Sequence, residues 1–173
     1  MNRSIVAVLW AVGIFAAIHL TDKYTHIEEN IMAIAKSTLS FITKEEGVRY
    51  RAYQDSKGLW TIGVGHLIKS SEPHLMTATL TQQEVDKLLE SDLKWCDDAV
   101  ASSVRVPLAQ PQYDALYSLC FNIGETQFKK STVVKKLNAN DYQGAADAIL
   151  LWNKPAVLEK RRKRERDLFL SAI

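Results

Sequence analysis

The chain has 173 residues, of which 47% are hydrophobic and 24% charged, so it can bury one substantial core. Seven Gly and four Pro are too few for a low-complexity or collagen-like protein. The 22 basic and 20 acidic residues nearly cancel, which gives no global case for a nucleic-acid partner.

The N-terminus carries a short apolar segment. Residues 5–20 are apolar apart from His19, with Arg3 before them and Asp22 and Lys23 after them. Such a helix spans about 24 Å, short of a hydrocarbon core of about 30 Å. The segment resembles a signal-peptide core, but no convincing cleavage site follows it. We interpret residues 1–26 as a weak, uncleaved signal anchor and linker. A removed signal peptide and a buried N-terminal helix are the alternatives.

Residues 27–173 are predicted to form the folded domain. Helical spacing favours a helix up to Glu46, ended by Gly47. Two β-like runs, residues 49–53 and 59–64, flank a turn and predict a hairpin. A capping box of Thr81 and Glu84 opens a further helix. Pro107 and Pro111 mark a break, and later helices are predicted over residues 112–123, 131–137, 141–152 and after Pro155. The expected class is α+β, with a small N-terminal hairpin or sheet lobe and a larger helical lobe.

Three side chains near the hairpin suggest acid–base chemistry. At a helix C-terminus, the helix dipole and the neighbouring Glu45 disfavour the ionised form of Glu46. A glycosidic oxygen needs a protonated carboxyl as general acid, while a second carboxylate acts on the opposite face of the sugar. Asp55 is available as that carboxylate, and the Thr61 hydroxyl can orient a water beside it. By themselves, these residues are better explained as a solvated helix end and an Asx turn.

The sequence motifs that surround these three residues are more specific than the residues themselves. Glu46-Gly47-Val48-Arg49 is followed by Asp55 and then by Thr61-Ile62-Gly63-Val64-Gly65-His66. This block closely resembles the phage-type lysozymes of the T4 lysozyme family, whose signature is an acid before Gly, an Asp nine residues on, and Thr-Ile-Gly-x-Gly-His. The resemblance continues through residues 112–124, 131–132, 137–138 and Trp152 to an Arg-Arg-x-x-Glu-x-x-Leu-Phe ending at residues 161–169. It covers residues 37–170.

The resemblance implies a lysozyme-like fold and hydrolysis of the β-1,4 bond between N-acetylmuramic acid and N-acetylglucosamine in peptidoglycan. It implies Glu46 as general acid, Asp55 as the carboxylate across the sugar and Thr61 as a residue that places the attacking water, with inversion at the anomeric carbon. His66 and Arg161 are expected near the acid in supporting roles. Many members carry a longer Gly-rich loop before the arginine than this chain does.

Other implications concern binding. Asn122 is similar to the family's sugar-contacting amide, and a helix-terminal cap explains it equally well. We expect a monomer without a cofactor. We also expect no metal site, because the scattered His and Cys lack the spacing of metal ligands.

The apolar N-terminus is similar to that of signal-anchor-release endolysins. Those phage lysozymes use the host export machinery and wait, inactive, on the inner membrane until the anchor leaves the bilayer. The resemblance implies an inner-membrane protein held through residues 5–20 and facing the periplasm, which is later released into the periplasm. A holin-like protein that depolarises the membrane is the implied partner. The segment contains no cysteine, which excludes thiol exchange from the anchor.

Two remaining features leave alternatives open. Export would place Cys96 and Cys120 in an oxidising compartment, where they either form a disulfide or stay free and buried. Residues 160–166 contain six basic residues. This run fits a solvated helix face with one arginine turned inward, or a cationic helix that permeabilises membranes without any enzymatic activity.

Overall fold

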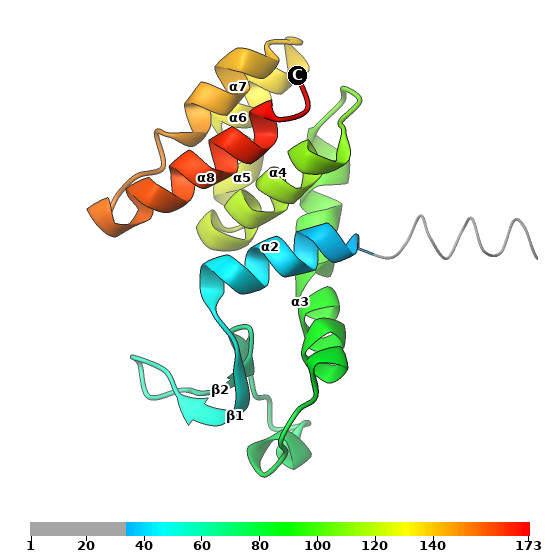
Figure 1. Ribbon diagram of the computed structural model, residues 1–173, viewed down its shortest axis with the longest axis vertical. Helices are drawn as coiled ribbons and strands as arrows, with labels where there is room; N and C mark the ends of the chain where they lie inside the picture. The colour runs from blue at the N-terminus through cyan, green and yellow to red at the C-terminus, as the bar shows by residue number, and fades with distance from the viewer. Residues whose placement is uncertain (1–33) are drawn as a thin grey trace, which may run out of the picture. The chain divides into compact units, whose positions relative to one another are not determined.

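A small antiparallel sheet and a larger group of helices make up residues 34–173, the part of the chain described by this computed structural model (Figure 1). The predicted α+β class, with a sheet lobe followed by a helical lobe, is confirmed. In chain order the elements are α2 (Lys36–Glu46), β1 (Arg49–Gln54), β2 (Trp60–Gly63), β3 (His66–Leu67), η1 (Pro73–Met76), α3 (Gln82–Ser103), α4 (Gln110–Ile123), α5 (Glu125–Lys130), α6 (Thr132–Asn138), α7 (Tyr142–Ile149), η2 (Ala156–Leu158) and α8 (Glu159–Leu170).

The sheet has the order β1-β2-β3, and both pairings are antiparallel. The β1–β2 hairpin forms where the sequence predicts it. Its turn includes Gly58 at φ +78°, a left-handed conformation that glycine adopts without steric cost. Strand β3 was not predicted, because a two-residue strand is too short to show the alternation that identifies a strand.

The long helix α3 connects the two lobes. It packs against β2 and β3 near one end and against α4 and α5 farther along (Figure 1). The predicted capping box opens it: the Glu84 N–H donates to Thr81 Oγ1 at 3.3 Å, and the Thr81 N–H donates to Glu84 Oε2 at 2.8 Å. Two N–H groups without helical acceptors are thereby satisfied.

We expect Thr81→Ala to lower the free energy of unfolding by about 1 kcal/mol, because the alanine leaves the Glu84 N–H without its acceptor. Chemical denaturation of the variant and the parent measures this difference. Ser56→Ala, at an exposed position of the hairpin turn, is the matched control and should leave the midpoint unchanged. Equal effects of the two changes would contradict the assignment of Thr81 as a stabilising cap.

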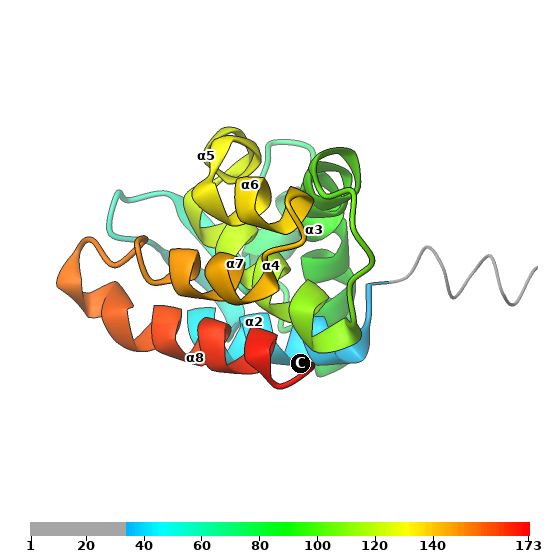
Figure 2. The same ribbon diagram turned by 90° about the horizontal axis from the view of Figure 1, so that it is seen from above.

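In the helical lobe, α4 is the central element and packs against α2, α3, α5 and α8 (Figure 2). Most of its residues from Gln112 to Cys120 are buried. The prediction that Pro111 breaks the chain is wrong, since Pro111 lies in the first turn of α4. A first-turn N–H has no helical acceptor, so proline costs nothing there. Helix α5, a single short helix between Gly124 and Ser131, was not predicted either.

The predicted signal anchor lies outside the described residues, as does most of the part before Lys36 of the helix predicted to end at Glu46. Among the helices of residues 34–173, none combines the length and the apolar character needed to cross a membrane.

Candidate active site

Glu46 is the last residue of α2, and its position is fixed at both ends of that helix. At the start of α2, Thr38 Oγ1 donates to the buried carboxylate of Asp114 on α4, with an oxygen–oxygen distance of 2.5 Å. At the end, the Gly47 N–H donates to Thr43 O at 2.8 Å, and Gly47 takes φ +77°. This left-handed residue directs the chain into β1 directly after Glu46.

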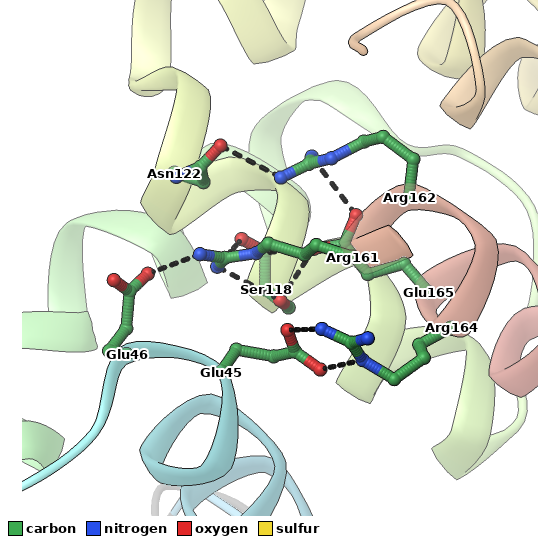
Figure 3. A network of polar contacts seen from close by, with 8 residues as sticks. All are labelled: Glu45, Glu46, Ser118, Asn122, Arg161, Arg162, Arg164 and Glu165. Carbon is green, nitrogen blue, oxygen red and sulfur yellow. Dashed lines mark hydrogen bonds and ion pairs between the residues drawn. The ribbon is translucent and has the colours of Figure 1, made fainter. Parts of the chain in front are cut away.

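Arg161 reaches Glu46 from α8 (Figure 3). Its Nη1 donates to Glu46 Oε1 at 2.7 Å, and its Nη2 donates to the Ser118 carbonyl at 3.1 Å. The Nε donates to Glu165 Oε1 at 3.0 Å. The Arg161 side chain is only 7% exposed, so its orientation is determined by these partners. The expected proximity of Arg161 to the acid is therefore present, although the segment before Arg161 is shorter than in many family members.

Glu45, the neighbouring acid, has an arginine partner of its own. Its side chain is 2% exposed and accepts two hydrogen bonds of 2.6 Å from Arg164 (Figure 3). These bonds hold the pKa of Glu45 below its usual range despite the opposing effect of burial. The like charge that Glu45 adds beside Glu46 is therefore accompanied by two arginines, Arg164 paired with Glu45 and Arg161 paired with Glu46.

Asp55 follows β1 and closes the hairpin turn. Its Oδ1 accepts from the N–H groups of Lys57 at 2.8 Å and Leu59 at 2.9 Å, so the Asx turn is present. Oδ2 has no hydrogen-bond partner within residues 34–173 and remains available to a ligand. The register pairs Tyr53 with Thr61, and the Asp55 N–H donates to Leu59 O. Asp55 and Thr61 are thus diagonal neighbours on adjacent strands.

Thr61 is buried at 3% exposure, and its Oγ1 donates to Leu59 O at 3.1 Å. The hydroxyl can still accept a hydrogen bond through its oxygen lone pairs. The Thr61 hydroxyl is therefore able to accept a hydrogen bond from a water molecule next to Asp55.

His66 lies on β3 and is 4% exposed. Its hydrogen bonds go to two carboxylates: Nδ1 lies 2.9 Å from Asp92 Oδ2, and Nε2 lies 3.1 Å from Glu72 Oε2. Glu46 is not among its hydrogen-bond partners in the described part of the chain. The backbone N–H of Lys69 is the main cause that lowers the pKa of Glu72, and His66 adds to it. His66 therefore links β3 to α3, and any effect on Glu46 is indirect.

Asn122 lies near the end of α4, where Arg162 Nη2 donates to its Oδ1 at 2.8 Å (Figure 3). Arg162 is fully buried, and its Nη1 lies 3.0 Å from Glu165 Oε2. Burial lowers the pKa of Arg162 and raises the pKa of Glu165, and each charge opposes this effect on the other. Asn122 is thus held in place with its amide nitrogen free of protein partners in the described residues.

The polar network around Glu45 and Glu46 includes four residues for which no site role was predicted: Ser118, Arg162, Arg164 and Glu165. Ser118 and Glu165 are completely buried and joined by a hydrogen bond of 2.6 Å from Ser118 Oγ to Glu165 Oε1. Two signals pointed to part of it: the Arg-Arg-x-x-Glu motif that begins at residue 161, and the single acid within the basic run of residues 160–166. Within residues 34–173, no cluster of three His, Cys, Asp or Glu side chains is arranged to hold a metal ion.

Cys96 on α3 and Cys120 on α4 are both buried free thiols. A hydrogen bond with the Cys120 thiol, followed by burial, raises the pKa of Cys96. We expect neither thiol to react with a thiol-specific reagent in the native protein, since both side chains are buried and access is blocked. Both should react once the chain is unfolded. A chain with no reactive thiol in denaturant would instead contain the alternative, a disulfide between Cys96 and Cys120.

Comparison with known proteins identifies the family. Residues 43–165 match the family model described as phage lysozyme. The endolysin of Salmonella phage P22 is 49% identical over 146 residues, which cover 82% of this chain and all of that protein. A crystal structure of a P22 lysozyme mutant superposes with a TM-score of 0.75, at 48% identity, and covers 80% of this chain and 98% of that one. The chain belongs to the phage lysozyme family.

Two further relatives extend the comparison of this phage lysozyme. The muramidase domain of SpmX from Asticaccaulis excentricus has a TM-score of 0.69 and 36% identity, and covers 79% of this chain and 97% of that one. The SAR-endolysin of Enterobacteria phage P21 is 33% identical over 130 residues, which are 72% of this chain and 77% of that protein. The fold of residues 34–173 is therefore the lysozyme-like fold that the sequence motifs implied.

Proposed function

We propose that this phage lysozyme is an endolysin that hydrolyses the β-1,4 bond between N-acetylmuramic acid and N-acetylglucosamine in peptidoglycan. The observation that carries the proposal is the contact of 2.7 Å between Arg161 and Glu46, at a helix end that directly precedes the Asp55 hairpin. Membership of the phage lysozyme family supports it.

In the proposed reaction, Glu46 gives its proton to the glycosidic oxygen as the bond to the anomeric carbon breaks. A water attacks that carbon from the opposite face, Asp55 accepts its proton through the free Oδ2, and Thr61 positions the water. Two hydroxyl-bearing products and an inverted anomeric centre result. Arg161 stabilises the Glu46 carboxylate that remains after protonation of the leaving group.

The ion pairs made by the basic residues of α8 argue against a cationic membrane-permeabilising protein. Five of the six basic residues within residues 160–166 have carboxylate partners in the described part of the chain. The pairs are Arg161 with Glu46 and Glu165, Arg162 with Glu165, Lys163 with Glu159, Arg164 with Glu45, and Arg166 with Asp147. Two of the arginines are also buried. An amphipathic helix that binds membranes needs its charges free on one face, and α8 does not provide that face.

The products test the proposal. Peptidoglycan from a Gram-negative bacterium, digested with the protein and then reduced with borohydride, should yield reduced N-acetylmuramic acid as the new chain end. Reduced N-acetylglucosamine would assign a different bond. Leakage of a dye from lipid vesicles without any new reducing end would instead support the permeabilising alternative.

We further propose that residues 5–20 hold the enzyme on the periplasmic side of the inner membrane after export, and that their release frees it into the periplasm. The weakly apolar composition of the segment and the similarity to the SAR-endolysin of phage P21 support this. Collapse of the membrane potential, normally by a holin-like protein, would trigger the release. Fractionation of cells before and after an uncoupler should show the protein moving from membrane to periplasm. A protein that stays entirely in the membrane fraction contradicts the proposal.

A further inference from the structure

A groove of about 350 Å³ lies between β3 and α3 and reaches α4. This volume is at the lower end of the range for small-ligand sites, about 300–1,000 Å³. The groove is lined by none of the three predicted catalytic residues Glu46, Asp55 and Thr61. It does include His66, for which a supporting role was predicted. The lining residues are Gly65, His66, Leu67, Lys69, Ser91, Asp92, Trp95 and Phe121.

The apolar side of the groove is an aromatic pair. The rings of Trp95 on α3 and Phe121 on α4 are stacked, with centroids 6.2 Å apart and planes inclined by 21°. Both side chains are half-buried, so they pack on the core and also contribute surface to the groove. Phe121 restrains the indole in one orientation, and a preoriented flat surface loses little conformational entropy when a ligand binds.

Helix α4 contributes residues both to the groove and to the network around Glu46. Phe121 lies one helical turn beyond Ser118, whose carbonyl and hydroxyl hold the arginine that contacts Glu46. Asn122, the next residue, has its amide held by Arg162. The groove thus shares with the Glu46 network a helix whose consecutive residues Phe121 and Asn122 belong to the two places.

We propose that Trp95 is a substrate-binding residue that stacks against one sugar ring of the glycan strand, away from the bond that is cleaved. A pyranose has a face of C–H groups and an edge of hydroxyl and amide groups. The indole matches the apolar face, while Ser91, Asp92 and Lys69 on the groove wall supply polar partners for the edge. The proposal rests on the proposed function only for the choice of glycan as ligand.

Binding of a peptide-free glycan tetrasaccharide to the full-length protein tests the role of Trp95. Measured by calorimetry with every protein carrying Glu46→Gln, which prevents turnover, Trp95→Ala should raise the dissociation constant about fivefold or more, as expected for loss of an aromatic stacking contact. Trp95→Phe should stay within about twofold of the parent, because a flat ring remains. Trp60→Ala is the matched control, since Trp60 is 45% exposed on β2 and does not line the groove.

Kinetics on the same glycan separate binding from chemistry. Trp95→Ala should raise KM with little change in kcat, as for an interaction equally strong in the ground and transition states. An unchanged dissociation constant, or a loss equal to that of Trp60→Ala, overturns the proposal. So does a Trp95 effect seen only with glycan that carries stem peptides, because the groove would then bind peptide. Because binding is measured without turnover, absence of hydrolysis by the parent would refute the proposed function and leave the assignment of Trp95 to be judged by the dissociation constants.

Discussion

Glu165→Gln is expected to lower the free energy of unfolding by about 3–5 kcal/mol, the usual cost of removing one partner from a buried ion pair. Glu165 is completely buried and lies 3.0 Å from both Arg161 Nε and Arg162 Nη1. Burial disfavours each of these charges, and they offset one another only while both signs are present. Glutamine keeps the shape of the side chain but leaves Arg162 buried without a counter-ion. Denaturant unfolding monitored by circular dichroism measures the loss.

A matched change on the same helix is the control for Glu165. Glu159→Gln removes an exposed carboxylate that pairs with Lys163 at 2.6 Å, and solvent screens that pair, so the midpoint of unfolding should hardly move. Combining Glu165→Gln with Arg162→Met should restore part of the stability, because both buried charges are then gone. Strictly additive effects in the double variant, or equal effects of Glu165→Gln and Glu159→Gln, would show that the buried pair is not coupled.

Local signals in the sequence were sufficient to predict much of the fold. The capping box of Thr81, the stop at Gly47 and the Asx turn at Asp55 all depend on residues within four positions of one another. The elements that escaped prediction, β3 and α5, are shorter than the window over which hydrophobic periodicity can be recognised. Pro111 was misread because proline is compatible with a helix start as well as with a break.

The candidate site was less predictable because its contacts are long-range. Glu45 and Arg164 are 119 positions apart, and Asn122 and Arg162 are 40 apart. The charge run of residues 160–166 predicted a mostly solvated helix face. In the structure, both Arg161 and Arg162 turn inward, because Ser118 and Glu165 provide buried acceptors for them. Which arginines turn inward depends on the acceptors that the fold places next to α8, and the sequence of α8 alone does not show what these acceptors are.

Glu46→Gln is expected to reduce glycan hydrolysis by about 10²–10⁴-fold, the typical contribution of a positioned general acid. Glutamine can still accept the hydrogen bond that Arg161 donates at 2.7 Å, so the variant should remain folded. What it lacks is the proton for the leaving oxygen. Release of reducing ends from peptidoglycan by parent and variant measures the loss.

Glu45→Gln provides the comparison, since the same chemical change is made one residue away. This change weakens a bidentate pair with Arg164 that holds the pKa of Glu45 below its usual value. A carboxylate with a lowered pKa in the folded state stabilises the protein above its unfolded pKa of about 4.3, and this contribution disappears as the pH falls. The parent should therefore be more stable than Glu45→Gln at neutral pH, with a difference that shrinks below about pH 4.

Glu45→Gln should keep most of its activity wherever it remains folded. If both variants lost activity to the same extent, the acid role would not belong to Glu46 alone, and the paired arginines of α8 would have to be considered as a unit.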